Sequence, residues 1–146
     1  MSGRIYSVGY EGLRVPGLVD ALVAAGVSLL VDVRLNPVSR KPGWSKNPLR
    51  ASLEAAGIDY RHEATLGNPP DNRDGFRQGD GQAARRRLGA ILVDRSGDAL
   101  QRLVDDARER RIAVLCVERS ARHCHRQLVT DMAQQIDPGI EVVDIL

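Results

Sequence analysis

Two short and almost uninterrupted aliphatic segments constrain the fold of this chain more than any other feature. Residues 28–34 read Ser-Leu-Leu-Val-Asp-Val-Arg, and residues 112–117 read Ile-Ala-Val-Leu-Cys-Val. A strand with one face in water alternates apolar and polar residues, whereas a strand covered on both faces is apolar almost throughout. We therefore predict that both segments are central strands of a mainly parallel sheet with helices on its two faces.

Weaker patterns predict the remaining elements. We expect strands at residues 5–10, 58–62 and 140–145, and helices at residues 16–25, 49–56, 83–93, 98–111 and 123–135. The segments 36–48 and 63–81 are expected to be loops, because Gly, Pro, Asn and Asp are frequent in them. Strands alternate with helices, and no linker or internal repeat divides the chain. The prediction is one three-layer α/β/α Rossmann-like domain over residues 1–146.

Composition excludes several classes of protein. A chain of 146 residues, 42% of them hydrophobic, can bury a core without disulfide staples. The formal net charge is +2 and aromatic residues make up 3%, so the chain lacks a strong positive field and a stacking platform for single strands. Nucleic acid is not excluded as a partner. No apolar stretch is long enough for a membrane, and the absence of an export signal predicts a cytoplasmic protein.

Polar residues follow the first central strand, where open parallel sheets bind their ligands. Asp32 lies inside the aliphatic run, and a buried aspartate needs a partner, so we expect it to be a structural group or a site residue. Arg34 and Arg40 could present two guanidinium forks to a small anionic ligand. Ser39 offers a hydroxyl between them. The prediction is that Arg34, Ser39 and Arg40 bind substrate.

A second polar cluster follows the other central strand. Cys116 and Glu118 share one face of the chain if it stays extended. Cys124 and His125 fall at the start of the next predicted helix, where the helix dipole and nearby arginines lower a thiol pKa. We expect Glu118 to act as acid or base, and Cys124 or His125 as nucleophile or proton carrier. Arg126 would join the anion-binding arginines, and Cys116 is either structural or part of the site.

The combined motifs resemble a known family. They are Asp32-Val33-Arg34 with Pro37 and Ser39-Arg40, then Leu66-Gly67, Cys116-x-Glu118 and Cys124-His125-Arg126, preceded by Ser7-Val8-Gly9-Tyr10. In this order they resemble the domain of unknown function 488 family over about residues 4 to 136. The resemblance implies a Rossmann-like α/β fold and no established general activity. One departure is Asn68, where family members often carry a second glycine.

Three interpretations of these residues stay open. The first is an enzyme that acts on a phosphorylated or nucleotide-like substrate. The second is a zinc site built from the cysteines, Glu118 and His125, although no Cys-x2-Cys pair is present and no metal ligand is assigned. The third is a non-catalytic regulator that binds a small ligand or RNA. The oligomeric state is not predicted.

Two specific chemistries are disfavoured. No Gly-x-Gly-x-x-Gly fingerprint or Walker loop is present, so we expect no NAD or ATP cofactor. Cys116 and Arg122 have the Cys-x5-Arg spacing of cysteine phosphatases. The loop between them contains no glycine, however, and Glu118 would repel a phosphate inside it.

Overall fold

The computed structural model of the chain describes residues 3–10, 12–34, 39, 42–66, 97–116 and 126–145. Within these ranges the strands form one sheet in the order β3-β2-β4-β1-β5, and every neighbouring pair is parallel. The strands are β1 (Arg4–Gly9), β2 (Leu29–Asp32), β3 (Asp59–His62), β4 (Ile112–Cys116) and β5 (Glu141–Asp144). The predicted α/β fold with a parallel sheet is confirmed.

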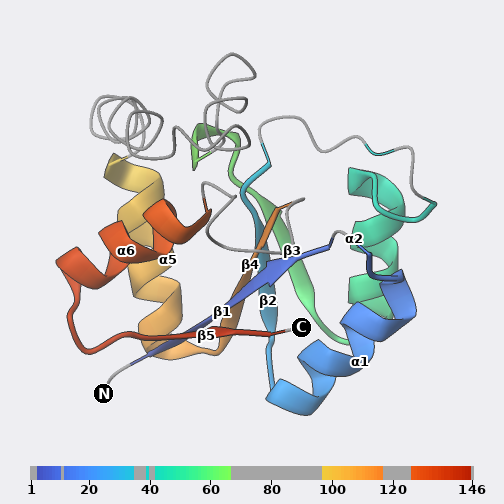
Figure 1. Cartoon of the computed structure of the whole chain (residues 1–146), viewed down its shortest axis with the longest axis horizontal. Helices are drawn as coiled ribbons and strands as arrows, with labels where there is room; N and C mark the ends of the chain where they lie inside the picture. The colour runs from blue at the N-terminus through green and yellow to red at the C-terminus, as the bar shows by residue number, and fades with distance from the viewer. Residues whose placement is uncertain are drawn as a thin grey trace.

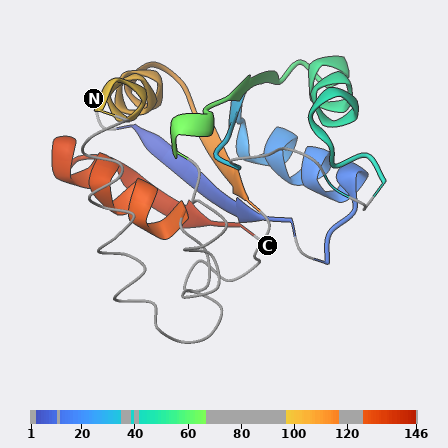
Figure 2. The ribbon, with the colours of Figure 1, turned by 90° about the horizontal axis from the view of Figure 1, so that it is seen from above.

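Two pairs of helices cover the two faces of this sheet. The helices are α1 (Val15–Ala25), α2 (Lys46–Ala55), α5 (Gly97–Glu109) and α6 (Arg126–Ile136), and a 3-10 turn, η1, spans Ala64–Leu66. Figure 1 shows α5 and α6 on one side of the strands and α1 and α2 on the other, and Figure 2 shows the same three layers from above. The predicted helix at 83–93 and most of the predicted loop at 63–81 lie outside the described residues.

The two aliphatic runs form the centre of the sheet, as predicted. Every residue of β2 and β4 is buried. Alternate side chains of β2 point to opposite faces: Leu29 and Val31 pack in the cluster with α5 and α6, and Leu30 packs in the cluster with α1 and α2. The edge strand β5 is only partly buried. The apolar pattern of each strand therefore follows from the number of its covered faces.

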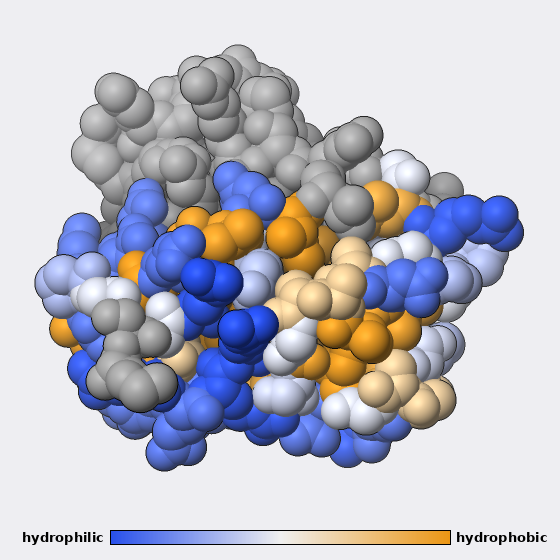
Figure 3. Space-filling model, turned by 90° about the horizontal axis from the view of Figure 1, so that it is seen from below, coloured by the Kyte–Doolittle hydropathy of each residue, from blue (hydrophilic) through white to orange (hydrophobic). Residues whose placement is uncertain are grey.

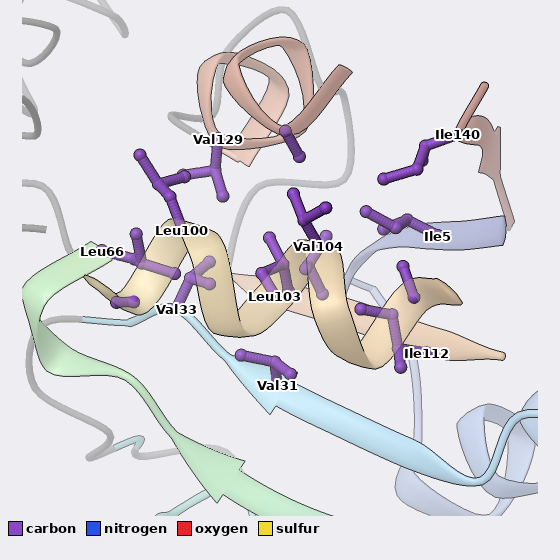
Figure 4. Packing of buried hydrophobic residues seen from close by; sticks show 14 of the residues in the cluster. Ile5, Val31, Val33, Leu66, Leu100, Leu103, Val104, Ile112, Val129 and Ile140 are labelled. Atoms are coloured by element: carbon purple, nitrogen blue, oxygen red, sulfur yellow. The ribbon is translucent and has the colours of Figure 1, made fainter. Parts of the chain in front are cut away.

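Helix α5 presents its apolar side to the sheet. Leu100, Leu103, Val104 and Ala107 are each at most 4% exposed. This is the inward face that the 3.6-residue period predicts. Figure 4 shows Leu103 and Val104 between the strands and α6.

The beginning of α2 differs from the sequence prediction. We predicted a loop up to Pro48, but the helix begins at Lys46 and includes Pro48 in its first turn. The N–H groups of a first turn have no partner within the helix, so the missing N–H of proline removes no hydrogen bond there. A proline near a helix start was therefore misread as a loop signal.

The surface differs between the two helix layers. Figure 3 shows apolar side chains gathering over the half of one face where α1 lies, and hydrophilic ones over the half with α5 and α6. Val23 of α1 is 55% exposed. None of the helices in the described ranges has the length and apolar character needed to cross a bilayer.

Candidate functional site

The strand order identifies one switch point at the carboxyl edge of the sheet. From β2 the chain continues through α2 to the edge strand β3, and from β4 it continues through α6 to the opposite edge strand β5. β2 and β4 are neighbours in the sheet, and the connections that follow them lead to opposite edges of it. Ligands of open α/β sheets bind in the crevice at such a point. The described residues nearest to this point are Asp32 to Arg34, at and just after the end of β2, and Cys116, the last residue of β4.

Asp32 and Arg34 form a buried ion pair at the end of β2. Arg34 Nε donates to Asp32 Oδ1 at 2.8 Å and Nη2 donates to Oδ2 at 2.7 Å. The backbone N–H of Arg34 also donates to Oδ1, at 3.1 Å. Asp32 is fully buried and Arg34 is 3% exposed. This two-pronged geometry is the strongest form of an arginine–carboxylate contact.

Aromatic residues from three other segments enclose the pair. The Tyr60 hydroxyl, on β3, donates to Asp32 Oδ2 at 2.5 Å. Arg34 Nη1 donates to the Trp44 carbonyl at 2.7 Å, and the guanidinium carbon lies 5.3 Å from the centre of the Tyr10 ring. The rings of Tyr10 and Trp44 stack, with centroids 4.5 Å apart and planes 14° from parallel. The arrangement holds the guanidinium in one orientation.

Electrostatics fix the ionisation of this network. Burial lowers the pKa of Arg34, but the hydrogen bonds and negative charge of Asp32 raise it more, so that the net shift is upward. Burial also raises the pKa of Tyr60, and the hydrogen bond to Asp32 raises it further. Arg34 therefore stays charged and Tyr60 stays protonated at neutral pH.

His62 lies at the end of β3, opposite Asp32 in the register of the two strands. Its Nε2 is 2.6 Å from the carbonyl oxygen of Arg34. A carbonyl oxygen only accepts hydrogen bonds, so Nε2 carries the proton and donates. In the neutral ring, Nδ1 is then the basic nitrogen. The contact gives His62 a defined tautomer beside the switch point.

Glu63 ties the end of β3 to α5. Its side chain is 9% exposed and lies between two arginines. Arg102 of α5 contacts both carboxylate oxygens, at 3.2 and 3.0 Å, and Arg61 Nε lies 3.0 Å from Oε1. Arg61 also pairs with Asp106 of α5. This group positions the carboxyl end of β3 against the helix layer.

The sequence-predicted residues are only partly described. Ser39 is tied to the turn before α2: its N–H donates to the Ser45 hydroxyl at 3.0 Å, and that hydroxyl donates back to the Ser39 carbonyl at 3.2 Å. Arg126 begins α6, but its side chain is outside the described residues. Arg40, Glu118, Cys124 and His125 are outside them entirely. The predicted convergence of three arginines stays a prediction.

Cys116 lies on the other face of the sheet from the ion pair. It is 1% exposed and belongs to the cluster with α5 and α6, whereas Tyr10 and Trp44 belong to the cluster with α1 and α2. Cys116 is disulfide-bonded. The only other cysteine in the sequence, Cys124, lies outside the described residues. In this state Cys116 is not a free thiol for catalysis or zinc. Among the described residues, no group of three potential metal ligands lies together.

Tyr10, Trp44, Tyr60, His62 and Glu63 were not among the predicted site residues. Two signals could have found some of them. Tyr60 and His62 stand in a predicted strand whose carboxyl end belongs to the ligand edge. Asp32, buried in an aliphatic run, required a partner from a neighbouring strand.

A hollow lies at the amino edge of the sheet, formed by residues that precede or begin β1, β4 and β5. It measures about 470 Å³, and its lining includes Arg4, Arg108 and Arg110. These arginines are already paired with carboxylates: Arg4 with Glu141 at 3.0 Å, Arg108 with Asp137 at 2.8 Å and Arg110 with Asp59 at 2.9 Å. Their charge is compensated within the protein, and the hollow is on the side away from the switch point.

Comparison with known proteins establishes the family. The model of the family described as domain of unknown function DUF488 matches residues 14–133. The chain belongs to this family, as its motifs suggested. No curated protein and no solved structure matches the chain.

Proposed function

We propose that the protein binds a small phosphorylated or nucleotide-like anion in the crevice outside the carboxyl ends of β2 and β4. The observation that carries the proposal is the buried ion pair of Asp32 and Arg34 at the switch point. Replacement of a buried ion pair by apolar side chains is often neutral or stabilising, so stability alone does not account for it. Its position at the ligand edge supports a role in the site.

Within this proposal Arg34 is a positioning residue. Three hydrogen bonds to Asp32 and Trp44 occupy its guanidinium, and Asp32 cancels its charge. It therefore holds the end of β2 in place rather than supplying net positive charge. The free charge for an anion comes from other arginines, for which the sequence offers Arg40 and Arg126.

Anion binding can be tested with thermal shift and calorimetry. Inorganic phosphate, phenyl phosphate and a nucleoside monophosphate should each raise the melting temperature of the wild-type protein. Arg40→Gln and Arg126→Gln should each weaken binding about tenfold or more, since each removes a charge-assisted hydrogen bond. Arg50→Gln is the matched control, because Arg50 is exposed on α2 and paired with Glu54. If no anion of this series binds, the proposal is wrong.

We extend the proposal to catalysis by Glu118, Cys124 and His125, the residues that follow β4 in sequence. Turnover of the bound phosphate ester should disappear in Glu118→Gln while ligand binding remains. A cysteine attacks only as a free thiolate, so the assay is run with and without reductant. Binding without turnover under both conditions would identify the protein as a non-catalytic ligand-binding module.

A further inference from the structure

A small cavity lies beside the candidate site, between the start of α1 and the start of α2. It has a volume of about 400 Å³ and is lined by Arg14, Val15 and Pro16 on one side and Pro42, Gly43 and Trp44 on the other. Apart from Arg14 these side chains are apolar or absent. The volume falls in the range of small-molecule sites, which are mostly apolar with few polar groups.

Trp44 links this cavity to the ion pair. The carbonyl of Trp44 accepts a hydrogen bond from the Arg34 guanidinium. The ring of Trp44 stacks on the ring of Tyr10, and the same guanidinium lies over the Tyr10 ring. The residues on the two sides of the cavity directly precede or begin α1 and α2, and those helices follow β1 and β2. The cavity therefore opens at the carboxyl edge of the sheet, as the candidate site does.

Arg14 gives the cavity a positive rim. It is exposed, and its side chain makes no hydrogen bond or ion pair with the residues that the structure describes. In this it differs from Arg34 and from the arginines at the amino edge, which carboxylates already neutralise. An apolar cavity whose rim carries a cation that pairs with no described carboxylate is complementary to a ligand that has an apolar group and a negative charge.

We infer that this cavity binds the ring of a phosphate monoester that carries a planar apolar group, such as an aryl phosphate or a nucleoside monophosphate. The inference rests on the proposed function and specifies its ligand class. The ring occupies the space between Val15, Pro16 and Pro42, and Arg14 adds a charged contact to the phosphate end. Inorganic phosphate alone leaves the cavity unused and binds less tightly.

Trp44 allows a direct test, since it is the only tryptophan in the chain. Titrations with phenyl phosphate and with inorganic phosphate are followed by tryptophan fluorescence and by calorimetry. We expect phenyl phosphate to bind about tenfold or more tightly than inorganic phosphate, because ring burial removes apolar surface from water. We also expect phenyl phosphate, and not inorganic phosphate, to change the emission of Trp44, which is buried next to the cavity.

Two variants separate the ring contact from the charge contact. Val15→Phe fills the cavity and should remove the preference for phenyl phosphate while leaving inorganic phosphate binding unchanged. Arg14→Gln should weaken phenyl phosphate about tenfold and cannot fail through misfolding of the core, because Arg14 is exposed. Arg50→Gln serves as the exposed control and should bind like the wild type.

The outcomes distinguish the two proposals. If inorganic phosphate binds but phenyl phosphate binds no more tightly, or if Val15→Phe keeps the ring preference, the cavity is not the ring site and the anion proposal stands. If neither anion binds, the anion proposal itself is overturned, and the ligand class inferred for the cavity falls with it.

Discussion

Removal of the charge of Asp32 tests how the candidate site is held together. Asp32 accepts hydrogen bonds from four donors: the N–H, Nε and Nη2 of Arg34 and the hydroxyl of Tyr60. In Asp32→Asn the carboxamide N–H2 replaces one oxygen and faces donors instead of accepting from them. The guanidinium of Arg34, 3% exposed, is left without its countercharge.

The expected cost follows from these contacts. Breaking a buried ion pair by removal of one partner costs about 3–5 kcal/mol, because the remaining charge stays buried. With a urea m-value of about 2 kcal/mol/M, the midpoint of unfolding should fall by about 2 M. Equilibrium urea unfolding, followed by Trp44 fluorescence, measures this shift directly.

Two controls make the result specific to the buried pair. Glu54→Gln breaks the exposed pair with Arg50 and should cost at most about 0.5 kcal/mol. The double variant Asp32→Leu with Arg34→Met removes both charges and should be more stable than Asp32→Asn alone. A loss in Asp32→Asn below about 1 kcal/mol, comparable to the exposed control, would refute the reasoning that Arg34 depends on Asp32.

Three further predictions concern neighbouring groups. Tyr60→Phe should cost about 1.5–3 kcal/mol at neutral pH, as expected for a hydrogen bond to a charged acceptor. Because the pKa of Tyr60 is raised in the folded state, its contribution is complete below the unfolded tyrosine value of about 10 and is lost as the pH rises above it. Wild-type stability should therefore fall more steeply in that alkaline range than the stability of Tyr60→Phe, and pH-dependent melts that run parallel would contradict this. Glu63→Gln should lower the free energy of unfolding in urea by about 1–2 kcal/mol. The loss is limited because Arg102, the partner of Glu63, is exposed to water, and it should become smaller in high salt. Gly43→Ala should lower the melting temperature more than Gly57→Ala. Both glycines have φ above +80°, so alanine is strained at either position. A Cβ at Gly43 would also lie 3.1 Å from Val15, whereas one at Gly57 would meet no atom within 4 Å.

The central strands and the inward face of α5 could be predicted because their signal is local. An apolar run or a 3.6-residue period reflects how many faces an element buries, and it can be read from a few consecutive residues. Pro48 shows the limit of such local evidence. The same residue is found in loops and in first helical turns, and the flanking sequence did not decide between them.

The environment of Arg34 could not be predicted in the same way. Its partners come from separate segments: Tyr10 follows β1, Trp44 precedes α2, and Tyr60 lies on β3. Tyr60 reaches Asp32 only because β3 pairs with β2 in a register that sets Tyr60 beside Leu30 and His62 beside Asp32. Strand order and register depend on the whole sheet, so the sequence indicated that Asp32 needed a partner but not which one.

The placement of the ion pair and of Cys116 follows from the topology of the switch point. The ion pair after β2 faces the layer of α1 and α2, whereas Cys116 at the end of β4 faces the layer of α5 and α6. A shared cleft on one face of the sheet would not bring them together. The crevice of a switch point, however, opens where one chain leaves toward one layer and its neighbour leaves toward the other. A ligand in that crevice would have the Asp32–Arg34 pair on one side and Cys116, the last residue of β4, on the other. The separation of Asp32 and Cys116 is therefore compatible with the proposed anion site.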